Sequence, residues 1–109
     1  MTTNPLARLS IVAYKPKPGM EAELLALSKE HVPYLRSIGA ASERPHVVAL
    51  AGDGTVVEVF EWLEGGLLKA HNHPGVQEMW ARYSAACDYV PLNTLAEAEH
   101  QFANFVPID

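Results

Sequence analysis

The stretch that decides the fold reads Val56-Val57-Glu58-Val59-Phe60-Glu61-Trp62. β-Branched and aromatic residues dominate it, which is typical of a strand. Successive side chains of a strand point to opposite faces, so Glu58 and Trp62 share one face and Glu61 lies on the other. Each face then places one carboxylate among apolar neighbours. A strand of this kind is expected to be covered on both sides.

The residues before this strand predict a hairpin. Gly52-Asp53-Gly54 is a tight-turn signal between two strand patterns. A strand over Pro45 to Ala51 should therefore lie antiparallel to one over Thr55 to Leu63. Both parities of the earlier strand are apolar as well, which again indicates a sheet with no wet face.

Two segments show helical spacing of apolar residues. The first predicts a helix from about Pro18 to Ile38, in which Pro33 causes a kink or separates the last turn, with a C-terminal cap at Gly39. Its stripe consists of Met20, Leu24, Leu27, His31, Leu35 and Ile38. The second predicts a helix that begins at Pro74 and ends before Pro91. Its stripe consists of Val76, Met79, Trp80, Tyr83, Cys87 and Val90.

The remaining segments supply the first and the last strand along the chain. Arg8 to Tyr14 and Gln101 to Ile108 read as strands, Leu67 to His71 as one helical turn, and Thr94 to Glu97 as a short extra helix. The order is then strand, helix, strand, strand, helix, strand. This predicts a single α+β domain over residues 1–109 with a ferredoxin-like βαββαβ fold. Its four-stranded antiparallel sheet should carry two long helices on one face.

The second apolar face of that sheet needs a cover of its own. Two helices cover only one face, and closed two-fold dimers are the commonest assembly. We therefore expect a homodimer, with the two sheets together forming an α+β barrel. The last strand, Gln101 to Ile108, should lie at a sheet edge near the partner.

Composition argues against several other classes. The net charge is −5, and the eight Lys and Arg residues form no cluster, so nucleic-acid binding is not expected. The longest apolar run, Val47 to Ala51, is far too short for a membrane span. Met1 to Ser10 lacks the apolar core of a signal peptide, which indicates a cytoplasmic protein. Cys87 is the single cysteine and is interpreted as a buried apolar residue.

Glu58 and His31 are the candidate polar groups of the interior. A carboxylate among apolar neighbours is costly unless it is paired, and it becomes a potential acid or base. The alternative for Glu58 is a structural ion pair. His31 lies on the apolar stripe of the first helix, where a satisfied core histidine is the alternative to a functional one. Tyr34 and Pro33 beside it indicate a helix face that is not simply packed core.

His71 and His73 lie where the chain enters the second long helix. Their spacing points the rings to nearly opposite sides, and no further ligand completes a site, so no metal and no cofactor is expected. His71 is the candidate base at a pocket mouth, and His73 is interpreted as a cap before Pro74. The pocket should lie between sheet and helices of one subunit. Its candidate lining residues are Glu58, Phe60, Trp62, His31, Tyr34, His71, Trp80 and Tyr83.

The element order, the motif Glu58-Val59-Phe60-Glu61-Trp62 and the position of His71 nine residues beyond Trp62 resemble the antibiotic-biosynthesis-monooxygenase-like superfamily. The resemblance implies a dimeric α+β barrel. It also implies a pocket that residues at the places of Trp62 and His71 help to form. Members include cofactor-free monooxygenases of polycyclic aromatics, heme-degrading enzymes and proteins of no known activity. Heme-degrading members use a first-strand asparagine, which Arg8 to Tyr14 lacks.

Two functional classes follow. The first is a cofactor-free monooxygenase acting on an aromatic, phenolic substrate, with His71 or Glu58 as base and with Trp62 and Phe60 as hydrophobic wall. The second is a non-enzymatic protein that binds a small molecule or has a structural role. Heme degradation ranks below both, because of the missing asparagine.

Overall fold

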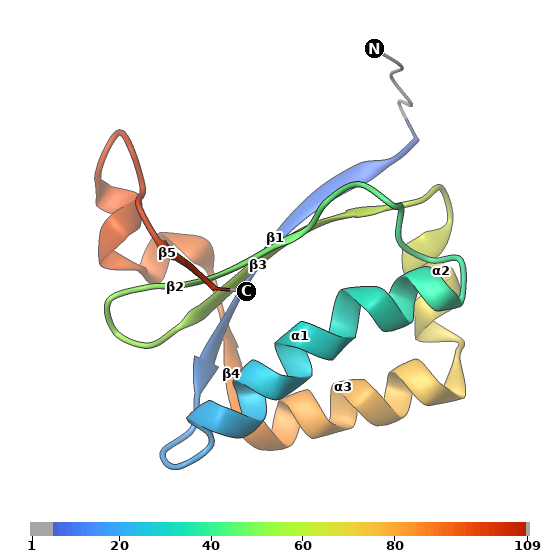
Figure 1. Ribbon diagram of the computed structural model, residues 1–109, viewed down its shortest axis with the longest axis horizontal. Helices are drawn as coiled ribbons and strands as arrows, with labels where there is room; N and C mark the ends of the chain where they lie inside the picture. Colours follow the sequence, from blue (N-terminus) through green and yellow to red (C-terminus); the bar gives the residue numbers. More distant parts are fainter. Residues whose placement is uncertain (1–5, 109) are drawn as a thin grey trace.

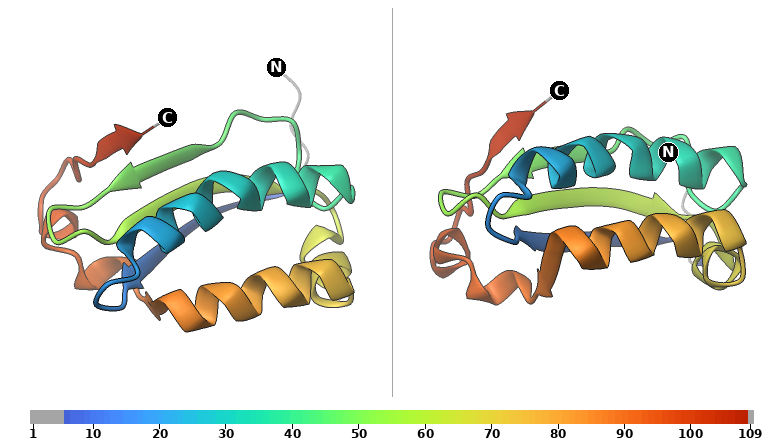
Figure 2. Two further views of the ribbon diagram at one scale, coloured as in Figure 1. Left: turned by 60° about the horizontal axis from the view of Figure 1, so that its bottom comes forward. Right: turned by 90° about the horizontal axis from the view of Figure 1, so that it is seen from below.

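The computed structural model describes residues 6–108, which form an α+β structure with an open antiparallel sheet (Figure 1). Two long helices lie side by side on one face of this sheet (Figure 2). The elements are β1 (Arg8–Pro16), α1 (Glu21–Ser37), β2 (Val47–Leu50), β3 (Val56–Trp62), α2 (Gly66–His71), α3 (Pro74–Ala86), β4 (Cys87–Val90), the 3-10 turns η1 (Leu92–Thr94) and η2 (Ala96–Glu99), and β5 (Val106–Ile108).

The strand β3, which is the stretch Val56–Trp62, lies at the centre of the sheet. The strand order is β4-β1-β3-β2-β5, and every neighbouring pair is antiparallel. The Gly52-Asp53-Gly54 hairpin joins β2 to β3 as predicted, closed by a hydrogen bond from the Ala51 amide to the Thr55 carbonyl. Glu58 pairs with Val12 of β1 on one side and with Val48 of β2 on the other. Its side chain is therefore held near the middle of the sheet.

The prediction of a four-stranded sheet is wrong about which segment forms the fourth strand and about the number of strands. The order β4-β1-β3-β2 is compatible with the ferredoxin-like pattern, but its fourth strand is Cys87–Val90, and β5 adds a fifth strand beside β2. The second long helix ends at Ala86, because Cys87 already has an extended backbone. Cys87 and Val90 fit a helical step of three, but they pair with Pro16 and Ala13 of β1.

The C-terminal segment also differs from its prediction. Only Val106–Ile108 of the predicted strand pairs with β2, at the edge of the sheet, and two 3-10 turns replace the expected short helix. Leu95, which follows η1, is buried against Ala13 and Val57 on the sheet face opposite the helices. The segment between β4 and β5 therefore covers one end of that outer face (Figure 2).

Proline, glycine and capping residues determine where the two long helices begin and end. Pro33 does not divide α1, which runs as one helix to Ser37. Gly39 ends it with a φ of +76°, as a C-terminal glycine does. His73 caps α3 by accepting a hydrogen bond from the Val76 amide, as the sequence suggested, and Pro74 is the first helical residue.

The two faces of the sheet differ in exposure. The inner face packs on the helices, and its β3 side chains, Val56, Glu58, Phe60 and Trp62, are all buried. The outer face carries exposed apolar side chains, with Leu9 at 61%, Ile11 at 51% and Val47 at 47%. Within residues 6–108, no helix has the length and apolar character needed to cross a membrane.

Candidate functional site

A pocket of about 510 Å³ lies on the inner side of the sheet, next to β1 and α3. Its size is within the usual range for small-molecule sites. Aromatic side chains form most of its wall, and exposed residues such as Tyr89 and Leu67 show that it reaches the surface. The lining residues are Ser10, Val12, Tyr14, His31, Phe60, Trp62, Leu67, Trp80, Tyr83, Ser84 and Tyr89.

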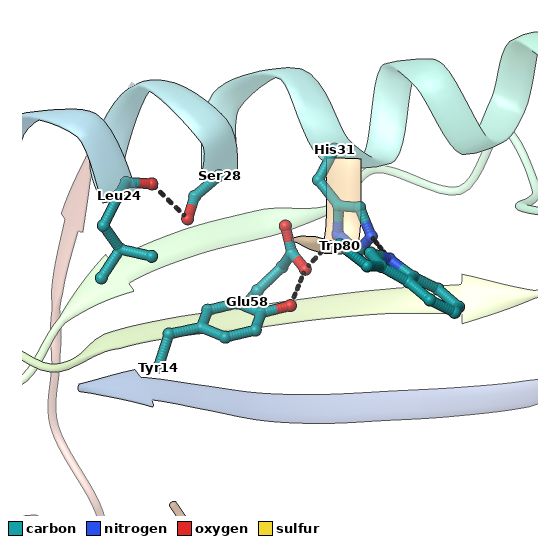
Figure 3. A network of polar contacts seen from close by, with 6 residues as sticks. All are labelled: Tyr14, Leu24, Ser28, His31, Glu58 and Trp80. Atoms are coloured by element: carbon teal, nitrogen blue, oxygen red, sulfur yellow. Dashed lines mark hydrogen bonds and ion pairs between the residues drawn. The ribbon is translucent and has the colours of Figure 1, made fainter. Parts of the chain in front are cut away.

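A chain of hydrogen bonds joins the pocket wall to the buried carboxyl group of Glu58 (Figure 3). Glu58 is 0% exposed, and its Oε1 accepts a hydrogen bond from the Tyr14 hydroxyl at 2.8 Å. The same oxygen lies 2.9 Å from Nδ1 of His31. On the far side of that ring, the Trp80 indole N–H donates to Nε2 at 3.0 Å.

These contacts determine the tautomer of His31. An indole N–H can only donate, so the Nε2 atom that receives it must be the unprotonated acceptor. The ring proton is then on Nδ1, which donates to the Glu58 carboxylate. His31 is therefore a neutral imidazole whose orientation Glu58 fixes, and its basic nitrogen lies next to Trp80 at the pocket wall.

The carboxylate affects the phenols around it. Burial raises the pKa of Tyr14 far above its usual range, and the negative charge of Glu58 raises it further. The pKa of Tyr83 is raised as well, mainly by burial and to a smaller extent by the charge of Glu58. Both hydroxyls therefore stay protonated at any physiological pH, and that of Tyr14 remains a donor to Glu58. Among the described residues, the Tyr83 hydroxyl and the Oε2 atom of Glu58 are buried without a hydrogen-bond partner.

Five of the sequence-predicted residues line the pocket together: His31, Phe60, Trp62, Trp80 and Tyr83. The His31 ring meets the edges or faces of three of them, with centroid distances of 5.1 to Tyr83, 5.8 to Phe60 and 6.5 Å to Trp80. Glu58 is fully buried and reaches the pocket only through its bonds to His31 and Tyr14.

The other two predicted residues are not part of the wall. His71 is exposed at the end of α2, and its ring packs against the ring of Trp80 with centroids 5.0 Å apart. The ring of Trp80 contacts both His71 and His31, and among the described residues no hydrogen bond or ion pair joins His71 to Glu58. Tyr34 packs against His73, with centroids 5.9 Å apart, and is not among the lining residues.

Tyr14 is the functional residue that the sequence argument missed. It lies at the end of β1, one strand away from Glu58, and the two are 44 positions apart. The sequence shows that Tyr14 lies on the same face of its strand as Val12. It also shows on which face of its own strand Glu58 lies. Whether the two side chains would meet depended on the register between β1 and β3, which places Val12 opposite Glu58.

The arrangement suits proton transfer rather than metal binding. Within residues 6–108, no three His, Cys, Asp or Glu side chains gather as a metal site would require. A carboxylate, an oriented imidazole and an aromatic wall are the parts of a general base beside an apolar pocket. Compared with known proteins, the chain matches no family model, no curated protein and no solved structure.

Proposed function

We propose that this protein binds a small phenolic aromatic compound in the pocket and acts as a cofactor-free monooxygenase, with His31 as its base. The observation that carries the proposal is the Glu58–His31 pair, which leaves the basic Nε2 at an aromatic wall. Glu58 orients the imidazole and stabilises the imidazolium that forms on proton uptake. His71 lies outside the wall and Glu58 is shielded by His31, so neither of them is the base in this proposal.

The proposed chemistry balances without a cofactor. His31 removes the proton of the phenol hydroxyl or of an activated ring CH₂. The resulting phenolate or carbanion transfers electrons from a ring carbon to dioxygen and forms a peroxide at that carbon. The peroxide then loses water and leaves a carbonyl group. Overall, one O₂ takes two hydrogen atoms, either from a ring CH₂ or from a phenol O–H and a ring C–H, and gives one new C=O and one H₂O. The apolar wall, with Trp62 and Phe60, keeps water from the anion.

A ligand-binding protein without turnover is the second candidate. It is favoured by one contact: the Trp80 indole occupies the acceptor that a substrate hydroxyl would need. A phenol that binds without displacing this indole would keep its proton. Oxygen consumption then separates the two candidates, because both predict phenol binding and only the monooxygenase predicts turnover.

The test measures binding and oxygen uptake with a panel of phenols and anthrones, using three histidine variants. We expect His31→Asn to abolish oxygen uptake, while His71→Asn changes it by less than threefold. His100→Asn is the matched control, since His100 is exposed on the C-terminal segment and does not line this pocket. Loss of uptake in His71→Asn alone would make His71 the base and refute the assignment.

We propose that the family resemblance and the assembly it implies also hold for this chain. The element order β4-β1-β3-β2 and the apolar outer face support a homodimer that packs sheet on sheet, in which the exposed Ile11 and Val47 become buried. Analytical ultracentrifugation of Ile11→Glu should show monomers, while Ala26→Glu, on an exposed site of α1, should remain dimeric. A monomeric wild type at micromolar concentration would refute the dimer. A cytoplasmic location remains a prediction.

A further inference from the structure

A second hollow adjoins the ligand pocket and opens at the end of the sheet near α2. Its volume is about 310 Å³. Three residues, Ser10, Trp62 and Leu67, line both this hollow and the pocket, so the two spaces meet there. Trp62 therefore forms part of the wall of both spaces.

The walls of this second hollow are largely apolar although they are exposed. Leu63, Leu67 and Leu68 line it with exposed fractions of 38%, 49% and 68%. Among the described residues that line it, Arg8 alone is charged, and its guanidinium donates to the Ala7 carbonyl at 2.8 Å. Exposed leucines gathered around one hollow are a sign of a binding surface for an apolar group.

We infer that the phenolic ligand carries a linear alkyl substituent that leaves the pocket past Leu67 and lies in this hollow against Leu63 and Leu68. The inference rests on the proposed function, since it places the phenol ring beside His31. The adjacency of the two spaces at Leu67 gives the path, and the leucine side chains give the chemistry of the substituent. A second polar or charged end group would find few polar partners in the hollow.

The experiment measures the dissociation constants of phenol and of a series of 4-alkylphenols with increasing chain length. Trp62 and Trp80 both line the pocket, so their fluorescence reports binding. Each methylene that is fully buried should lower the dissociation constant by up to about fourfold, and the gain should stop once the chain fills the hollow.

Two variants locate the effect. Leu63→Gln/Leu68→Gln changes side chains that line the second hollow and not the pocket. We expect this variant to bind phenol as the wild type does, but to gain less than twofold per methylene. Phe102→Ser is the matched control, because Phe102 is an exposed apolar residue that lines neither space. It should keep the full gain per methylene.

The outcomes separate the inference from the function on which it rests. Phenol binding with a chain-length gain that the leucine variant reduces supports the inference. Phenol binding with no gain, or with the same gain in the leucine variant, overturns the alkyl substituent and leaves the phenol site standing. If neither phenol nor any alkylphenol binds, the phenol site is refuted and the inference falls with it.

Discussion

Replacing Tyr14 with phenylalanine removes one of the two hydrogen bonds that hold the buried carboxylate. The Tyr14 hydroxyl donates to Oε1 of Glu58 at 2.8 Å, and His31 is then left as its sole partner among the described residues. Hydrogen bonds to charged groups contribute about 1.5–3 kcal/mol. The free energy of unfolding should therefore fall by about 2 kcal/mol at pH 7, which lowers the melting temperature by roughly 10 °C in a domain of this size.

The same variant should change the response to alkaline pH. The folded-state pKa values of Tyr14 and Tyr83 are raised above the usual 10, mainly by burial. Both hydroxyls are neutral in either state below pH 10, so their stabilising effect is complete there. Above pH 10 the unfolded chain loses these protons first, and stability falls by about 1.4 kcal/mol per pH unit for each group. Burial also raises the pKa of Tyr89, which therefore acts in the same direction. Tyr14→Phe removes the contribution of Tyr14 alone.

Urea unfolding between pH 7 and 11.5, followed by circular dichroism, measures both effects. Tyr89→Phe is the matched control, because it removes a hydroxyl from the exposed neighbour of the Tyr14 ring. It should change stability by less than about 0.5 kcal/mol. The reasoning is refuted if Tyr14→Phe costs no more than this control, or if it loses stability above pH 10 as steeply as the wild type.

Three further predictions concern separate parts of the molecule. Trp80→Phe removes the donor on Nε2 of His31, and phenols should bind roughly fivefold more tightly in a fluorescence titration because they no longer displace that bond. Gly66→Ala should lower the free energy of unfolding by about 1–3 kcal/mol in urea, because a Cβ there would collide with the Ala40 carbonyl oxygen. Burial raises the pKa of Cys87 to about 11, so a disulfide reagent at pH 8 should label the thiol in urea but not in buffer.

Much of the fold was predictable because the informative patterns are local. The alternation along Val56–Trp62 correctly placed Glu58 on the same face as Trp62, and Gly52-Asp53-Gly54 correctly predicted the hairpin. The fourth strand was missed for a physical reason. A span as short as Cys87–Val90 fits a helical step of three as well as a strand, and its pairing with Pro16 depends on contacts some seventy positions apart.

The sequence predicted which residues form the site better than it predicted the hydrogen bonds that connect them. His31, Trp62 and Trp80 were named from the sequence, and all three line the pocket. The hydrogen bonds that join His31 to Glu58 and to Trp80 span 27 and 49 positions, and no local pattern encodes such pairings. The role given to His71 came from its place where the chain enters the second long helix, and the family resemblance supported it. The structure places that residue outside the pocket wall, behind Trp80.

The protonation of the two His31 ring nitrogens tests most directly whether Glu58 and Trp80 hold this residue as a neutral base at the pocket. Long-range nitrogen–proton correlation spectra of labelled protein at pH 7, assigned with His31→Asn, report each nitrogen separately. We predict a protonated Nδ1 and an unprotonated Nε2, with Nε2 shifting when a phenol binds and His71 unaffected. A proton on Nε2 in the free protein, or a phenol response confined to His71, would contradict the assignment of His31 as the base.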